Sequence, residues 1–353
     1  MKTQNTQLKP AGPRIASRSA GLLIRLNTYR AAVLALFLAG ATLLGTSATS
    51  AGTITVININ DSGPGSLRQA LVKANNGDTI NFDSSLNGQR ITLTSGQLNV
   101  DKDVTISGPG AKNMAVDGTT QSRVFYVNPG KTVTIDGLTV ANGYTGFYGG
   151  GIYNDSATLT VTNCMLSGNS AYSGGGIRNE SANGGATLTV TNSTISGNSA
   201  GYHGGGILND AFNAGFAGVE TGNTIFDAGS SGENIFNYAG TVTSLGYNVS
   251  SDDGGGFLPG PGDQINTNPL LGPLQDNGGS TYTHALLPTS PAINAGDPSF
   301  TPPPFYDQRG PGFYRVVNGR IDVGSFEVQG PRPTPTPRPS PTPRHRPTPV
   351  PRP

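Results

Sequence analysis

A seven-residue block occurs three times in this chain, as GGGIYND at residues 149–155, GGGIRNE at 174–180 and GGGILND at 204–210. The isoleucines of successive blocks are 25 and 30 positions apart. A period of 20–50 residues indicates a repeat architecture, in which each repeat buries its apolar residues only by stacking on its neighbours. We therefore expect equivalent residues of successive blocks to lie one above another.

A second element, LTVTN at 159–163 and 188–192, separates the blocks and has weaker copies, VTI, at 104–106 and 133–135. Leu and Val alternate with Thr in it, and a period of two is typical of a strand with one buried face. Short strands broken by Gly-Gly and Gly-Asn turns suit a coil that climbs one strand spacing, ~4.8 Å, per repeat. The sequence thus predicts an all-β fold, a right-handed parallel β-helix.

The composition agrees with this prediction. Of 353 residues, 52 are Gly and 27 are Pro, and only 12% are charged, which is unlike a helical bundle. Glycine does not recur at every third position, so collagen is excluded. The single cysteine, Cys164, excludes an intramolecular disulfide framework and replaces Ser193 of the next copy, so we interpret it as a small packed side chain.

Charge divides the chain into unlike parts. Residues 1–30 hold six Lys and Arg without an acid, and residues 330–353 hold five Arg without an acid. Between them, residues 52–329 hold all 21 acidic and 11 basic residues, a formal charge of −10. An acidic body argues against nucleic-acid binding, which needs a basic surface.

Residues 1–51 are interpreted as a signal peptide, because a basic segment precedes an apolar run at 31–45 and small residues up to Ala51. The run is shorter than the ~20 residues that span a bilayer, so no transmembrane segment is expected after removal of the signal. The alternative is that this segment is not cleaved and remains as an N-terminal membrane anchor. A secreted, extracellular or cell-surface protein is therefore expected.

The rest of the chain is divided by its repeats. We predict a β-helix over 52–256, a C-terminal cap over 257–329, where the repeat is lost, and a disordered Pro- and Arg-rich tail over 330–353. The segment 66–75 starts with the potential N-cap Ser66 and predicts a short helix that covers the N-terminal end. The tail is either a solvated stalk or a basic segment that holds cell-envelope polymers by charge.

The chain resembles bacterial secreted right-handed β-helix proteins that have a choice-of-anchor type of C-terminal region. The resemblance lies in NDSGPGSLRQA at 60–70 and DTINF at 78–82, and at the other end in NPLLGPL at 268–274, SPAINAGD at 290–297 and DVGSFE at 322–327. The repeats are also similar to those of polymorphic outer-membrane proteins. The resemblance implies surface display after export, a pectin-lyase-like solenoid and no defined reaction.

An adhesin or glycan-binding module is therefore the expected function, with an extracellular polysaccharide or a host or cell-surface glycan as partner. The alternative is a polysaccharide lyase or glycoside hydrolase, because parallel β-helices also house such enzymes. A lyase needs a base and a glycosidase needs two opposed carboxylates. The adjacent acids Asp252 and Asp253 precede three glycines and are interpreted as a turn. No catalytic residues are assigned.

Aromatic residues precede each glycine triplet: Tyr148, Tyr172 and Tyr202, with His203 beside the last. Stacked at one turn of the solenoid, they would form a flat strip suited to sugar rings, or a row that only packs over the turn. Arg178, the basic residue within the blocks, is assigned with them to a carbohydrate-binding site.

The carboxylates that end the blocks, Asp155, Glu180 and Asp210, are expected to stack outward ~4.8 Å apart. Solvent and Arg178 screen their repulsion, or Ca²⁺ binds them through oxygen ligands. We expect that the protein requires no cofactor; the alternative is that it binds Ca²⁺ at these carboxylates. The asparagine before each carboxylate, at 154, 179 and 209, is expected to point inward and form an amide ladder.

Overall fold

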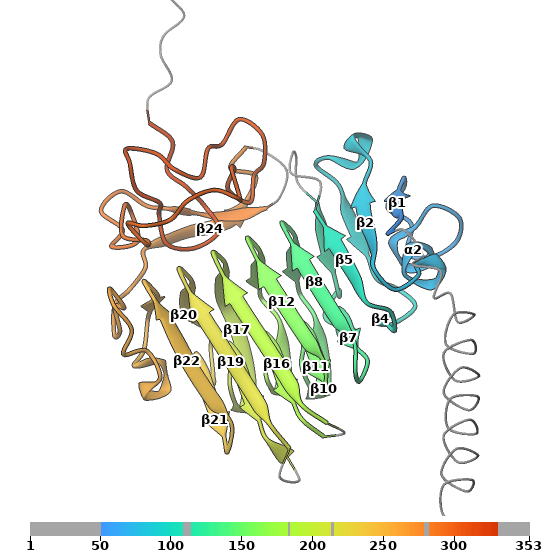
Figure 1. Ribbon diagram of the computed structural model, residues 1–353, viewed down its shortest axis with the longest axis horizontal. Helices are drawn as coiled ribbons and strands as arrows, with labels where there is room; N and C mark the ends of the chain where they lie inside the picture. Colours follow the sequence, from blue (N-terminus) through green and yellow to red (C-terminus); the bar gives the residue numbers. More distant parts are fainter. Residues whose placement is uncertain (1–50, 109–113, 183, 213–214, 279–281, 331–353) are drawn as a thin grey trace, which may run out of the picture. The chain divides into compact units, whose positions relative to one another are not determined.

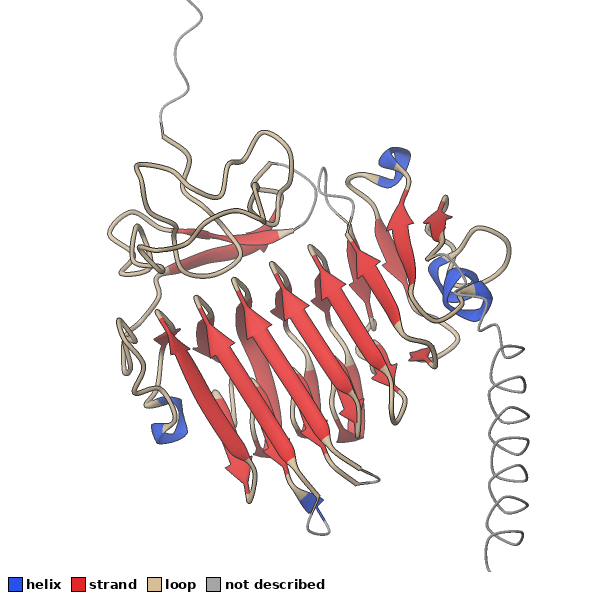
Figure 2. Cartoon of the chain, in the orientation of Figure 1, coloured by secondary structure: helices blue, strands red, loops and turns tan. Residues whose placement is uncertain are grey.

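The computed structural model describes residues 51–330, except 109–113, 183, 213–214 and 279–281. In this part the chain is a parallel β-helix, in which strands of successive coils stack into three parallel sheets (Figures 1 and 2). The all-β, parallel β-helix fold predicted from the repeats is confirmed. The signal peptide predicted at 1–51, apart from Ala51, and the tail predicted after Gly330 lie outside the described residues.

The first sheet contains eight strands, in the order β1 (Thr53–Val56), β2 (Asp78–Phe82), β5 (Val104–Ser107), β8 (Thr132–Asp136), β12 (Thr158–Thr162), β16 (Ala186–Thr191), β19 (Ala217–Gly222) and β22 (Thr241–Gly246). The second contains six strands, β4 (Leu98–Val100), β7 (Phe125–Val127), β11 (Ile152–Asp155), β15 (Ile177–Glu180), β18 (Ile207–Asp210) and β21 (Ile235–Tyr238).

The third sheet contains β3 (Arg90–Thr92), β6 (Ala115–Asp117), β9 (Thr139–Ala141), β13 (Met165–Ser167), β17 (Thr194–His203), β20 (Ile225–Ala228) and β23 (Val249–Ser250). The second half of β17 also pairs with β14 (Ser170–Ser173), which pairs with β10 (Tyr144–Tyr148). The long strand β17 therefore joins this sheet to the strands that carry the tyrosines.

The strand register places the three repeated blocks in alignment. Ile152 pairs with Ile177 and Ile177 with Ile207, and all three side chains are buried in the core. In β12 and β16 the residues alternate between the core and the surface, as the Leu and Val alternation predicted. The predicted stacking of repeats is thereby confirmed residue by residue.

The glycine triplets are required by the tight turn before the second sheet. Gly174 has φ +68°, a conformation that favours glycine. A Cβ on Gly176 would lie 2.5 Å from the carbonyl oxygen of Gly206 in the next coil. Successive coils therefore approach too closely at this corner for any side chain, which is why the triplet recurs.

A ladder of asparagines runs through the interior, as predicted. Asn154 Nδ2 donates to Asn179 Oδ1, Asn179 Nδ2 to Asn209 Oδ1, and Asn209 Nδ2 to Asn237 Oδ1, each at 2.7 Å. The first three residues are fully buried. Asn237, which the repeats did not identify, ends the ladder. A second pair, Asn169 Nδ2 to Asn198 Oδ1 at 2.8 Å, lies in the same coils.

The predicted N-terminal helix is confirmed as α2 (Leu67–Lys73), a helix of seven residues beside β1 and β4 (Figure 1). Ser66 is its N-cap and accepts a hydrogen bond from Gln69 N. Leu67 and Leu71 are buried and belong to the main apolar core. The helix thus covers the apolar end of the first coil. A short 3₁₀ turn, η1 (Ser84–Leu86), follows β2.

The segment predicted as a C-terminal cap divides into two parts. Its first part follows the turn η3 (Gly254–Gly256), which is capped by Asp253 and ends the segment predicted as the β-helix, and it places Leu258 in the main core. The turn itself contacts β21. The described residues of 268–329 lie instead along the third sheet and include the antiparallel pair β24 (Leu271–Gln275) and β25 (Thr283–Leu286) (Figure 1). We call residues 268–329 the side cover.

Contacts over several coils hold the side cover in place. Thr139 Oγ1, in β9, donates to Tyr282 O at 2.8 Å, and Asp297 N donates to Asn223 Oδ1, just after β19, at 2.8 Å. Between these points, apolar residues of the cover pack on Ile225 and form a second core. The third sheet offers the cover apolar side chains at Ile225 and Val249 and a hydroxyl at Thr139, whereas η3 already packs beside β21 in the last coil.

Candidate carbohydrate site

A groove of about 670 Å³ lies where β10, β14 and the end of β17 face the second sheet. All five residues assigned to sugar binding from the sequence line it: Tyr148, Tyr172, Arg178, Tyr202 and His203. We call this the side groove. The glycine corner before the second sheet sets the position of the tyrosines, because each one precedes a triplet whose backbone conformation is fixed.

The aromatic rings of the side groove are ordered from coil to coil. Tyr172 and Tyr202 lie with ring centroids 5.7 Å apart and planes within 6° of parallel. His203 stacks on Phe236 at 3.8 Å and 3°, and contacts Tyr202 at 4.1 Å. Tyr172 and Tyr202 remain 52% and 62% exposed, so the stacked rings are accessible from solvent. The tyrosines thus stack from coil to coil at one turn of the solenoid, and their use by a sugar stays a prediction.

Arg178 lies at the base of the side groove and is almost fully buried. Its Nε donates to Glu180 Oε2 at 2.6 Å, its Nη2 donates to Asp210 Oδ2 at 2.7 Å, and the ring of Tyr148 covers its guanidinium at 4.0 Å. A buried charge is tolerated only with such partners. The positive charge of Arg178 is therefore balanced within the protein.

The carboxylates Asp155, Glu180 and Asp210 share one register position, in accordance with the repeat. They are buried, each 7–9% exposed, rather than standing free on the surface. Tyr153 and Arg178, each two places before an acid, donate to the acid of the next coil, Glu180 and Asp210. Burial explains why the pKa of Asp210 is raised, although Arg178 opposes the shift.

Each of these carboxylates accepts a hydrogen bond from a side chain of the preceding coil. Tyr126 OH donates to Asp155 Oδ2 and Tyr153 OH donates to Glu180 Oε2, both at 2.6 Å. Burial and then the bond to Asp155 raise the pKa of Tyr126 to about 12, so it stays a donor. In the part of the chain that the structure describes, no three His, Cys, Asp or Glu side chains are grouped as metal ligands.

The sequence did not identify some lining residues, among them Phe236 and Tyr238 of β21. They occupy the register positions of Leu208 and Asp210, but no glycine triplet precedes the stretch IFNY at 235–238. Its similarity to the repeated ILND could have revealed them. Glu233 was also missed; its Oε1 lies 3.2 Å from Nδ1 of His203. That contact comes from an irregular turn, which no repeat marks.

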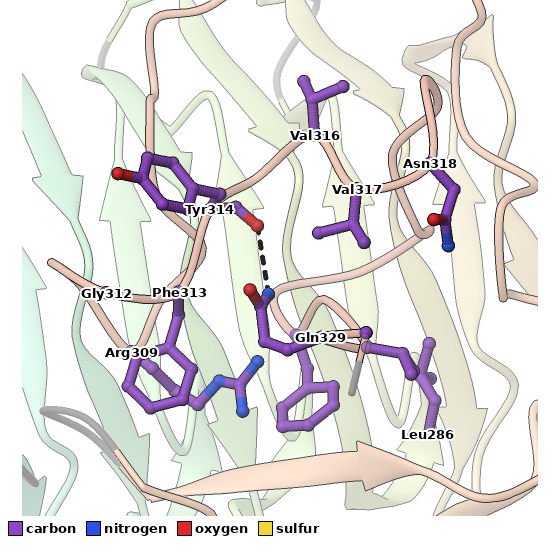
Figure 3. Close-up of a pocket in the computed structure, with 12 residues that line it drawn as sticks. Leu286, Arg309, Gly312, Phe313, Tyr314, Val316, Val317, Asn318 and Gln329 are labelled. Atoms are coloured by element: carbon purple, nitrogen blue, oxygen red, sulfur yellow. Dashed lines mark hydrogen bonds between the residues drawn. The ribbon is translucent and has the colours of Figure 1, made fainter. Parts of the chain in front are cut away.

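A second cavity, of about 750 Å³, lies within the side cover (Figure 3). Its lining is mainly apolar, and Gln329 Nε2 donates to Tyr314 O at 3.0 Å across it. The guanidinium of Arg309 is held between the rings of Phe313 and Phe326, at 4.1 and 3.7 Å, and pairs with Asp307. None of the sugar-site or carboxylate residues predicted from the sequence lies in this cavity.

Fold and groove together define a parallel β-helix protein with an aromatic-lined side groove. No protein-family model matches the sequence, and no curated protein matches it. A similar solved structure is Jun a 1, the major allergen from cedar pollen, at 16% sequence identity and a TM-score of 0.36. The match covers 58% of this chain and 61% of that one. Such a likeness carries no argument about function, and the fold assignment here rests on the strand register.

The structure has no helix, among the described residues, with the length and apolar character needed to cross a membrane.

Cys164 is buried, with its Sγ 3.1 Å from Thr162 O, and burial raises the pKa of the thiol. Its interpretation as a packed side chain is therefore confirmed.

Proposed function

We propose that the chain is an exported β-helix protein that binds carbohydrate in the side groove and acts as a glycan-binding module or adhesin. The observation that carries the proposal is the parallel, exposed pair of rings Tyr172 and Tyr202 beside the polar groups of Arg178 and its carboxylates. Aromatic faces stack on the apolar faces of sugar rings, while polar groups next to them orient the hydroxyls.

The test is to substitute Tyr172→Ala and Tyr202→Ala and to measure binding to a glycan array and then to the best glycan by calorimetry. Each substitution should weaken binding about three- to tenfold, because one stacking face is lost. Both side chains are exposed, so the fold should persist. Tyr314→Ala, which removes a tyrosine that is 60% exposed on the side cover, is the matched control and should bind as the unaltered protein does.

An enzyme is the second candidate, because His203 in the same groove is oriented through Nδ1 by Glu233, as a general base would be. A polysaccharide lyase acting on a uronate would release unsaturated products that absorb in the ultraviolet. Incubation with oligogalacturonate should give no such products if the groove only binds. Their appearance, and their loss in His203→Ala, would favour the enzyme.

We further propose export to the cell exterior and attachment to acidic envelope polymers through residues 330–353. Five arginines without an acid in that segment support the attachment, since they are attracted to anionic polymers. The resemblance to surface-displayed β-helix proteins supports export. Deletion of 330–353 should abolish retention on isolated envelopes, and high salt should release the full chain. Equal retention of both forms would contradict the attachment.

A further inference from the structure

The side groove is acidic, although an arginine lies at its base. Arg178 is the one Lys or Arg in the described lining, and its charge is balanced by Glu180 and Asp210, which leaves a formal charge of −1. Glu233, whose side chain is 42% exposed, adds a second negative charge beside His203. Burial opposes ionisation, but the backbone N–H groups of Glu233 itself and of Gly204, together with the His203 contact, lower the pKa of Glu233, so it is ionised.

The exposed aromatic rings, like the carboxylates, favour a positively charged ligand. The face of a tyrosine ring carries negative electrostatic potential and attracts a cation. Tyr172 and Tyr202 are exposed in the groove and supply such π-systems, and the rings of His203 and Phe236 lie next to them. An anionic sugar entering the groove would meet carboxylates and ring faces but no unbalanced cation. A sugar with an ammonium group would be attracted both by the carboxylates and by the aromatic rings of the groove.

We propose that the side groove selects glycans that bear free amino groups, such as β-linked glucosamine oligomers, over neutral glycans and over uronates. The proposal rests on the proposed carbohydrate-binding function and adds a charge preference to it. Stacking on the tyrosines accepts any pyranose ring, so it cannot by itself distinguish these ligands. The carboxylates of Glu180, Asp210 and Glu233 supply the distinction.

The experiment compares three hexasaccharides by calorimetry with the full chain: glucosamine, N-acetylglucosamine and galacturonate oligomers. At about 0.01 M salt the glucosamine oligomer should bind about tenfold more tightly than the N-acetylated one, and the galacturonate oligomer most weakly. At about 1 M salt the preference should shrink to about twofold, since the Debye length falls to about 3 Å.

The outcomes separate this inference from the proposed function. Equal binding of the glucosamine and N-acetylglucosamine oligomers, or tightest binding of galacturonate, would overturn the charge preference and leave carbohydrate binding intact. Absence of binding by all three, together with an empty glycan array, would overturn both proposals. A preference that persists unchanged at high salt would also count against a charge origin.

Two variants locate the preference in the groove. Glu233→Gln keeps the shape of an exposed side chain and should lower the preference for glucosamine about threefold. Asp101→Asn is the matched control, because it removes one negative charge from a side chain that is 53% exposed and outside the groove lining. If both variants lower the preference equally, the net charge of the whole body causes it and the groove assignment is wrong.

Discussion

At the scale of single residues, the asparagine ladder depends on each side chain having neighbours on both sides. Asn179 accepts from Asn154 and donates to Asn209 and to Gly218 O, with no exposure to solvent. Asn237 has only one asparagine partner and is partly exposed. A buried polar group that loses its partner costs about 1–3 kcal/mol, so an interior member should matter more than a terminal one.

We therefore expect Asn179→Ala to lower the free energy of unfolding by about 2–4 kcal/mol and Asn237→Ala by about 1 kcal/mol or less. Asn179→Ala leaves Asn209 Oδ1 without its donor and Gly218 O without a donor from Asn179, and it removes one of the acceptors of Asn154, which keeps Ala157 O. Asn237→Ala removes only one acceptor of Asn209 Nδ2, which keeps Ala217 O. Urea unfolding of both variants measures the difference. Equal losses would contradict the ladder as a cooperative unit.

The sequence could predict this ladder because the asparagine stands at one fixed place in each repeated block. It could also predict that Tyr172 and Tyr202 lie together, for the same reason. It could not predict Glu233 beside His203, because that contact depends on a turn outside the repeats. Nor could it predict that Tyr126 and Tyr153 serve the carboxylates, since a diagonal contact between coils appears only when side-chain directions are known.

At the scale of elements, strands β7, β11, β15 and β18 carry the acids and the donors that hydrogen-bond to them, although Asp210 Oδ1 has no partner among the described residues. Each of the first three strands gives a donor to the acid of the following coil, first Tyr126 to Asp155, then Tyr153 to Glu180, then Arg178 to Asp210. The repulsion expected between stacked carboxylates is thus offset by the neighbouring strand. Ca²⁺ binding to this column stays a prediction, but the contacts favour a column that folds without metal.

Removal of divalent metal should therefore leave the thermal unfolding midpoint unchanged. The carboxylates already accept phenol and guanidinium hydrogen bonds at 2.6–2.7 Å, so a chelator removes no partner that the column needs. Differential scanning calorimetry with and without EDTA checks this. A midpoint that falls by several degrees with EDTA and recovers with added Ca²⁺ would instead support the calcium alternative.

At the scale of the whole described molecule, the β-helix followed from the repeats but the side cover did not. The repeat is lost after residue 256, and the sequence indicated only that a terminal segment follows. A covering segment can pack at the end or along the wall. The choice depends on where apolar surface is left open, here at Ile225 and Val249 of the third sheet, and that is a property of the assembled coils.

The side cover contains a buried ionisable group that makes its stability depend on pH. Glu327 is fully buried; its Oε2 accepts from Asp322 N at 2.8 Å. Burial, and then the charge of Asp322, raise the pKa of Glu327 to about 9, although Arg315 opposes the shift. Burial also raises the pKa values of Asp307 and Asp322, so these two groups, like Glu327, make the folded state less stable as the pH rises.

A carboxyl whose pKa is raised in the folded state binds its proton more tightly there than in the unfolded chain. Its contribution to stability is complete below the unfolded pKa of about 4.5 and is lost as the pH rises toward about 9. Between these values, unfolding should become easier by up to about 1.4 kcal/mol per pH unit for this one group. Glu327→Gln, which cannot ionise, should flatten that slope.

Hydrogen exchange would measure which part of the molecule loses stability as the pH rises. As the pH rises from about 5 to about 9, protection corrected for intrinsic exchange should fall first in β24 and β25 of the side cover, while β12 and β16 in the first sheet stay protected. The reason is that the acids Asp307, Asp322 and Glu327 lie in the cover, whereas the coils are held by the asparagine ladder and apolar stacking. Glu327→Gln should keep the cover protected at the higher pH. Equal loss of protection in the cover and the first sheet would mean that the molecule unfolds as one unit and that the cover has no separate stability.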